Sequence, residues 1–262
     1  MYMQDIIIIN DLNYRSFENF YLNISNNKFI SIIGANNSGK TTLFKLISGI
    51  IPTTNVITCN NILLNRNNVN KYIKQLGLVY PLRKDSFLFD NVYDELVYPL
   101  KNLGYTNFYI KKQVNRILKL FSLDIKEKKI KDLSNYEKQV LIFCLALIHN
   151  PKVLLIDDVF CYMNDSEKNK IINILKSIKK LTIINFSSSF NNCDVSDYIY
   201  ILDNGKIITE GKYYNILNES KTLIKLGIEI PFVVNLSNKL KEEGISNKEY
   251  FKLEDLVNNV WE

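Results

Sequence analysis

The amino-acid sequence predicts an α/β fold, a nucleotide-binding core that a block of helices interrupts. Short strand patterns alternate with helical patterns along much of the chain, and a glycine-bounded loop follows an early strand. Residues 91–150, by contrast, show helical patterns without a convincing strand. Such alternation is typical of a sheet covered by helices. We expect one nucleotide-binding domain at 1–220, with a helical subdomain at about 90–150, and a helical appendage at 221–262.

Runs of apolar and β-branched residues locate the individual elements. The expected strands cover residues 5–9, 20–24, 28–33, 76–80, 153–156 and 181–186. Residues 198–208 predict a hairpin, because Asn204-Gly205 is a dipeptide that a type I′ turn favours. The amphipathic pattern at 166–180 predicts a helix, and Pro231 is expected to begin another.

Composition excludes several classes of protein. The chain has 262 residues, of which 47% are hydrophobic and 23% charged, so we expect a folded protein rather than a disordered one. It contains no run of 18 apolar residues that would span a membrane, and its first residues do not resemble a secretory signal. The four cysteines form no CxxC pair, which indicates reduced, buried thiols in a cytosolic protein. The net charge of +6 is spread without a Lys/Arg block, and we expect no nucleic-acid partner.

The segment Gly34-Ala-Asn-Asn-Ser-Gly39-Lys40-Thr41 is the clearest motif. It matches GxxxxGK(S/T) between a predicted strand and a predicted helix, where backbone N–H groups and the helix N-terminus face phosphate oxygens. Lys40 is expected to reach the β- and γ-phosphates and to act in catalysis, and Thr41 is expected to bind Mg²⁺. The predicted nucleotide contacts are Gly34, Asn36, Asn37, Ser38, Gly39, Lys40, Thr41 and Thr42. The plainer interpretation is a glycine-rich turn.

Two aspartates follow the apolar run at 153–156. Asp157 is expected to hold Mg²⁺ through its water shell, as the acidic residue that ends a buried strand does in such sites. The alternative is that Asp157 and Asp158 only cap the following helix.

With these motifs in place, the chain resembles the ATP-binding subunits of ABC transporters. Leu133-Ser-Asn-Tyr-Glu-Lys-Gln139 stands shortly before the acidic strand, where that family carries its LSGGQ signature. The stretch 226–245, with the following KLEDLV, is similar to the energy-coupling-factor ATPases, which power uptake of vitamins and metal ions such as cobalt. A generic amphipathic helix after Pro231 is the alternative explanation of that stretch.

The resemblance implies an ABC-type P-loop fold with an N-terminal antiparallel β region. It also implies ATP and Mg²⁺ as ligands, Asp158 at the position of the catalytic base, and Ser134 as a signature contact to ATP. Tyr14 either stacks on adenine or packs on the core. The family works as head-to-tail dimers on integral membrane subunits. We therefore expect a second ABC ATPase as partner, membrane-subunit contacts near residues 81–100, and a peripheral location at the cytoplasmic face of the membrane.

Several positions depart from the family pattern, and all bear on hydrolysis. Pro81 stands where the family has a glutamine, and a proline offers neither an amide side chain nor an N–H. Asp158 replaces the family's glutamate, and Ser188 replaces its switch histidine. The only histidine, His149, is expected to be structural or solvated at a helix end. Asp165 is either a family aspartate displaced by one residue or a helix cap.

The signature is also altered. Asn135 and Tyr136 replace two glycines, and Glu137 replaces a neutral amide. Ser134 and Glu137 have the spacing of a capping box, so we expect the segment to begin a helix. The function expected is an energy-coupling ATPase with weak turnover at its own site, in a heterodimer with a more intact ATPase. The alternative is a pseudo-ATPase scaffold that binds ATP without cleaving it. An ABC protein acting on DNA or ribosomes is less favoured. A GTPase is also less favoured, because this sequence contains no NKxD motif for reading guanine.

Overall fold

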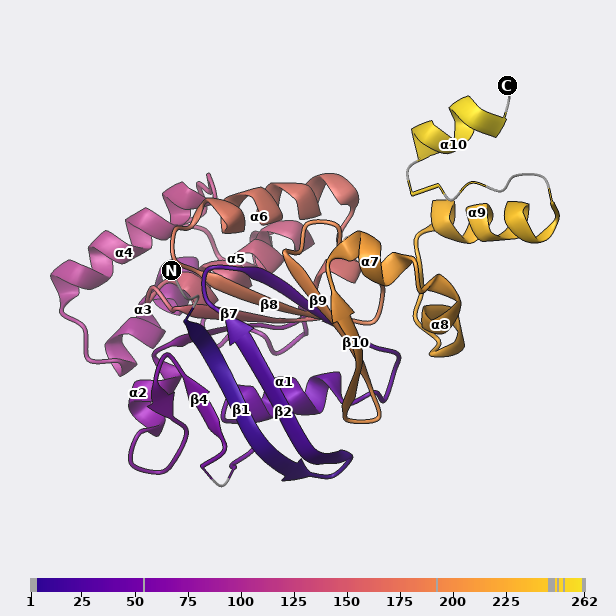
Figure 1. Cartoon of the computed structure of the whole chain (residues 1–262). Helices are drawn as coiled ribbons and strands as arrows, with labels where there is room; N and C mark the ends of the chain where they lie inside the picture. The colour runs from indigo at the N-terminus through magenta and orange to yellow at the C-terminus, as the bar shows by residue number, and fades with distance from the viewer. Residues whose placement is uncertain are drawn as a thin grey trace.

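Two β-sheets form the centre of the molecule (Figure 1). The computed structural model describes residues 4–53, 55–191, 193–244, 248, 250, 251 and 253–260. The four-stranded sheet has the order β2-β1-β4-β5 and consists of β1 (Asp5–Tyr14), β2 (Phe17–Ser25), β4 (Ile57–Cys59) and β5 (Ile62–Leu63). The six-stranded sheet has the order β10-β9-β3-β8-β7-β6. Its strands are β3 (Phe29–Ile33), β6 (Leu76–Val79), β7 (Val153–Asp157), β8 (Thr182–Ser187), β9 (Tyr198–Asp203) and β10 (Lys206–Gly211).

The helices cover both faces of the larger sheet. The α-helices are α1 (Lys40–Ile47), α2 (Val69–Ile73), α3 (Val92–Asn102), α4 (Asn107–Leu120), α5 (Asn135–Leu147), α6 (Asp165–Ser177), α7 (Tyr213–Leu217), α8 (Ser220–Lys225), α9 (Phe232–Glu242) and α10 (Leu253–Val260). Short 3₁₀ helices span Ile130–Asp132 and Phe160–Tyr162. Every residue of β3 is buried, as expected of a strand in a parallel sheet covered on both faces.

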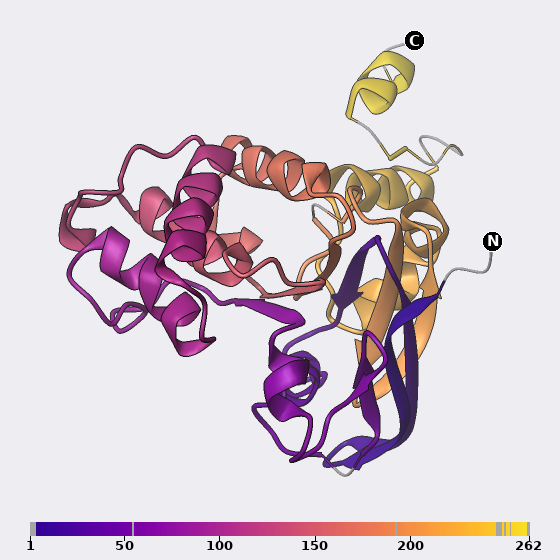
Figure 2. The ribbon, with the colours of Figure 1, turned by 90° about the vertical axis from the view of Figure 1, so that its left-hand side faces the viewer.

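Three apolar clusters hold these layers together. Helix α1 packs between the two sheets. There the rings of Phe44 and Phe186 meet edge to face, with 5.6 Å between their centroids. The opposite face of the large sheet packs against α3, α4, α5 and α6 in the largest cluster. Figure 2 shows α3 and α4 to one side of the two sheets, joined to them through α5. The third cluster packs α7, α8 and α9 against β3 and β9.

The expected α/β architecture is confirmed, and each strand predicted from the sequence is present. The hairpin also forms as predicted, since Asn204 and Gly205 have φ values of 45° and 75° and so occupy the left-handed region that a type I′ turn requires. Strands β1 and β2 are longer than expected. The short elements β4, β5 and α2 were not predicted, because two to five residues carry too little periodicity.

In the part of the chain that the structure describes, no helix has the length and apolar character needed to cross a membrane. All four thiols are free. Cys59, Cys144 and Cys193 are buried as expected, but Cys161, in the short 3₁₀ turn after β7, points outward and is exposed.

Candidate functional site

The predicted site residues meet at one edge of the larger sheet. Strands β6, β7, β8 and β3 run parallel, so their carboxyl ends lie at the same edge. The phosphate loop follows β3, Asp157 ends β7 with Asp158 directly after it, and Ser188 follows β8. Ligands of open α/β sheets bind at this edge, where loops rather than strands provide the side chains.

The phosphate loop adopts a conformation that depends on its two glycines. Gly39 has φ 106°, which disfavours any side chain, and it comes directly before α1. Gly34 lies against the Leu202 carbonyl oxygen, and an added Cβ would collide with it. The loop therefore packs tightly on the sheet while its backbone turns toward the N-terminus of α1.

Lys40 is buried and its ammonium group is held by the loop itself. Its Nζ donates to the carbonyl oxygens of Gly34 at 2.6 Å and Ala35 at 2.8 Å, and lies 3.5 Å from the Ser38 hydroxyl. Burial lowers the pKa of Lys40, and the carboxylates of Asp158 and Asp157 act in the opposite direction. These carbonyl contacts are ones that phosphate oxygens can replace.

A cavity of about 550 Å³ opens above this loop. It is lined by Arg15, Ser16, Asn36, Asn37, Gly39, Lys40, Thr41, Thr42, Pro81, Arg83, Asp157 and Asp158. Its volume lies within the roughly 300–1,000 Å³ of small-molecule sites. Thr41 provides a hydroxyl and Asp157 a carboxylate, the oxygen ligands with which proteins hold Mg²⁺ beside a nucleotide's phosphates. The loop and cavity thus fit a magnesium–nucleotide complex.

The surroundings of Asp157 disfavour its ionised form. Burial raises the pKa of its carboxyl, and the neighbouring Asp158 carboxylate raises it further. Lys40, Lys45 and Arg83 act in the opposite direction. A divalent cation at this position would relieve the repulsion between the two carboxylates.

Asp158 is turned toward the residue that follows β8. Its φ is 52°, and its Oδ2 accepts a hydrogen bond from the Ser188 hydroxyl at 3.0 Å. Its Oδ1 accepts from the Ser188 backbone N–H at 3.3 Å. Two of the positions at which the sequence departs from the ABC pattern therefore contact each other, and Ser188 fixes the orientation of the carboxylate.

Four of the predicted nucleotide contacts, Gly34, Ser38, Ser134 and Tyr14, are not among the residues that line this cavity. Gly34 and Ser38 belong to the phosphate loop and lie against the Lys40 ammonium group. Ser134 is the N-cap of α5: its Oγ accepts from the Glu137 backbone N–H at 3.1 Å, and Glu137 Oε2 accepts from the Ser134 N–H at 2.8 Å. The predicted capping box is confirmed. Tyr14 is half-buried and packs on the cluster between the sheets, with the Arg15 guanidinium 5.4 Å from its ring centroid.

Sequence reasoning missed three residues of the cavity: Arg15, Ser16 and Arg83. They lie in a turn and an irregular loop, where no motif marks which side chains face the site. Of the two alternatives expected for His149, the structural one holds, since its Nε2 lies 3.0 Å from the Leu76 carbonyl oxygen and burial lowers its pKa. Asp165 does not cap α6: Asn164 is the N-cap, with the side-chain oxygen that accepts from the N–H three residues on.

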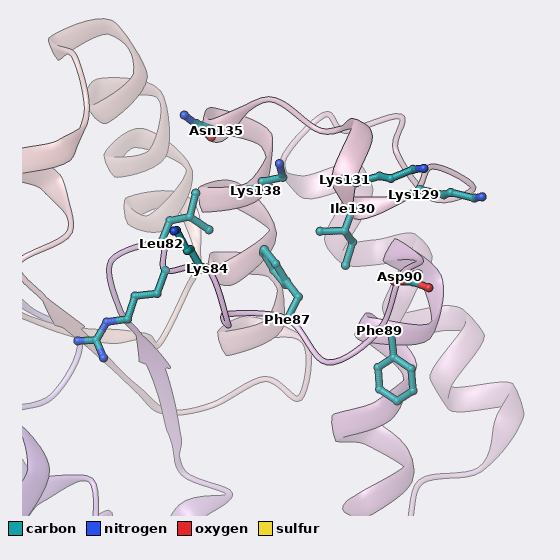
Figure 3. Close-up of a pocket in the computed structure, with 11 residues that line it drawn as sticks. Leu82, Lys84, Phe87, Phe89, Asp90, Lys129, Ile130, Lys131, Asn135 and Lys138 are labelled. Atoms are coloured by element: carbon teal, nitrogen blue, oxygen red, sulfur yellow. The ribbon is translucent and has the colours of Figure 1, made fainter.

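A second cavity, of about 790 Å³, lies between the loop after β6 and the segment that precedes and begins α5. Figure 3 shows the apolar side chains of Leu82, Phe87 and Ile130 at this cavity, which we call the basic groove. The charged residues that line it are Arg83, Lys84, Asp90, Lys129, Lys131 and Lys138. The basic groove therefore has five cationic side chains and one carboxylate, Asp90, around the apolar side chains of Leu82, Phe87 and Ile130, which form its floor.

Comparisons with known proteins agree with a nucleotide-binding site of the ABC type. The sequence model of the ABC transporter family matches residues 17–160, more than half of the chain. An energy-coupling factor transporter ATP-binding protein, EcfA, from Pediococcus pentosaceus is 28% identical, and the match covers 93% of this chain and 91% of the relative. EcfA1 from Oenococcus oeni is 26% identical, with 98% and 97% covered.

Solved structures share the fold. CbiO1 from Clostridium perfringens, described as part of the ABC transporter complex CbiONQ, superposes with a TM-score of 0.73 at 22% identity, over 85% of this chain and 94% of that one. The ATP-binding cassette MJ0796, solved as a dimer bound to ADP and phosphate, gives a TM-score of 0.66 at 19% identity, over 79% and 99% of the two chains.

Proposed function

This chain belongs to the ABC transporter family, and on that premise we propose that it is the ATP-binding, energy-coupling subunit of an energy-coupling-factor transporter that takes up a vitamin or metal ion. One observation carries the proposal: the phosphate loop, the buried Lys40 ammonium, Thr41 and Asp157 line a single cavity of nucleotide size. The nearly full-length similarity to EcfA proteins supports the transporter class.

ATP would lie with its phosphates on residues 34–42, where Lys40 exchanges the carbonyl oxygens of Gly34 and Ala35 for phosphate oxygens. Thr41 and Asp157 would hold Mg²⁺, which neutralises phosphate charge when bound. Tyr14 remains a candidate for the adenine side, and its neighbour Arg15 lines the cavity directly.

Turnover at this chain's own site is proposed to be slow. Asp158 is the residue in position to orient an attacking water, but its carboxylate is held by both donors of Ser188. Pro81 lines the cavity and offers no donor. Misplacing a general base costs typically about 10²–10⁴-fold in rate. A scaffold that never cleaves ATP is the second candidate, and the same Asp158–Ser188 contact favours it.

The chain is proposed to work in a head-to-tail dimer with a more intact ABC ATPase. Ser134 lies on the N-terminus of α5 and does not line this chain's nucleotide cavity. It would therefore contact the phosphates of a nucleotide bound by the other subunit. Residues 1–220 would form the ATPase domain, with 90–150 as its helical part, and 221–262 an appendage.

An integral membrane subunit is proposed to dock in the basic groove. Its apolar floor and the surrounding lysines suit a helix that carries both apolar and acidic side chains. Leu88 and Tyr98, within the range 81–100 expected from the sequence, are exposed to 72% and 41% and extend the apolar surface. Such docking would place the chain at the cytoplasmic face of the membrane.

The test is ATP turnover by the native complex, purified with its ATPase and membrane partners, after each phosphate loop is disabled in turn. We expect Lys40→Ala to retain a large share of the turnover, and the matching change in the partner to remove nearly all of it. Equal losses from both changes would contradict slow turnover at this site. Restoring Asp158→Glu with Ser188→His separates the two candidates, since a gain in turnover indicates a weakened enzyme and no gain a scaffold.

A further inference from the structure

The loop after β6 carries an arginine into the nucleotide cavity. Arg83 lines the cavity together with Pro81, Lys40, Asp157 and Asp158. Arg83 also lines the basic groove, as does Leu82, which precedes it in the chain. The loop therefore presents Pro81 and Arg83 to the nucleotide cavity, and Arg83 provides a guanidinium group where the two cavities meet.

The backbone on both sides of Arg83 is held in place. The buried Gln139 side chain donates to the Tyr80 carbonyl at 3.2 Å and accepts from the Leu82 N–H at 3.0 Å. On the other side, the Arg83 N–H donates to the Ser86 hydroxyl at 2.8 Å. These bonds fix where the arginine leaves the backbone, although its side chain is exposed.

Arg83 lines the same cavity as the two aspartates that follow β7. Its positive charge acts on the Asp157 carboxyl and lowers the pKa of that group. Within the described residues, the Arg83 side chain has no hydrogen bond or ion pair, in contrast to Lys40. Its five N–H donors are thus available to an anion.

We propose that Arg83 binds the terminal phosphate of ATP, from the same chain's loop, in place of the glutamine that Pro81 replaces. This inference rests on the proposed function, because it requires ATP in this cavity. A planar guanidinium can donate two parallel hydrogen bonds to phosphate oxygens, and such charge-assisted bonds are roughly twice as strong as neutral ones. Arg83 would thereby discriminate a triphosphate from a diphosphate.

The experiment measures binding rather than turnover. The full chain is titrated calorimetrically with a non-hydrolysable ATP analogue and with ADP, each with Mg²⁺, for the wild type, Arg83→Ala and Arg83→Lys. We expect Arg83→Ala to weaken the ATP analogue about tenfold, the effect of losing a hydrogen bond to a charged group, and to leave ADP within about twofold. Arg83→Lys keeps the charge without the planar fork and should fall between.

Arg66→Ala is the matched control, because Arg66 is also exposed but lines a separate cavity near β5. It should change neither affinity. Equal affinities for wild type and Arg83→Ala, or an equal loss for both nucleotides, would overturn the role of Arg83 while leaving the proposed function intact. Failure of the folded wild type to bind either nucleotide would overturn the proposed function itself.

Discussion

Removing the Ser188 hydroxyl should release the carboxylate of Asp158, and the size of the effect follows from the contacts. Ser188→Ala deletes the donor to Asp158 Oδ2 at 3.0 Å and keeps the backbone donor to Oδ1 at 3.3 Å. A hydrogen bond to a charged group contributes about 1.5–3 kcal/mol. Both residues are half-buried, so water competes for the carboxylate and the cost should be about 1 kcal/mol. That cost lowers the midpoint of thermal unfolding by about 2–4 °C.

A double-mutant cycle isolates this interaction from other effects of the substitutions. The free energy of unfolding is measured in urea for wild type, Ser188→Ala, Asp158→Ala and the double variant. We expect a coupling energy of about 1 kcal/mol. Ser189→Ala serves as the control, because its hydroxyl accepts from the Asn191 N–H and makes no contact with Asp158. A coupling energy near zero between Ser188 and Asp158 would refute the reasoning. So would an equal coupling energy between Ser189 and Asp158.

Three further predictions concern stability and docking. In nucleotide-free protein, Asp157→Asn should increase the free energy of unfolding at pH 7, because the raised pKa of Asp157 makes its ionised form costly in the folded state. The gain should vanish below about pH 4, where the wild-type carboxyl is protonated in both the folded and the unfolded state. Denaturation curves measured across this pH range check the prediction. Gly34→Ala should cost about 1–3 kcal/mol in the same measurement, since the new Cβ collides with the Leu202 carbonyl, and wild-type stability would contradict it. Lys131→Glu in the basic groove should reduce co-purification of the membrane subunit, whereas Lys111→Glu on α4 should not.

The sequence was sufficient to predict the fold because its strands are of two readily recognised kinds. Buried parallel strands such as Val153–Asp157 appear as short apolar runs, and the hairpin at Asn204-Gly205 has a turn dipeptide of known geometry. The same local rules predicted the capping box of Ser134 and Glu137. In each case, a few neighbouring residues determine the structure.

The remaining features depend on contacts between distant segments. Nothing near Arg83 in the sequence indicates that it lines the nucleotide cavity, because its position depends on the Gln139 side chain, 56 residues further along the chain. The pairing of Asp158 with Ser188 likewise requires β7 and β8 to lie side by side. The sequence showed that both positions depart from the family, but not that they contact each other.

The most direct test is calorimetric titration of the correctly folded chain with ATP and Mg²⁺, beside Lys40→Ala. Saturable association is predicted for the wild type, and its loss is predicted for the variant, which lacks the ammonium group of the phosphate loop. Circular dichroism should show that both proteins are folded. No heat of binding from the folded wild type, or unchanged affinity in Lys40→Ala, would contradict a nucleotide site at residues 34–42.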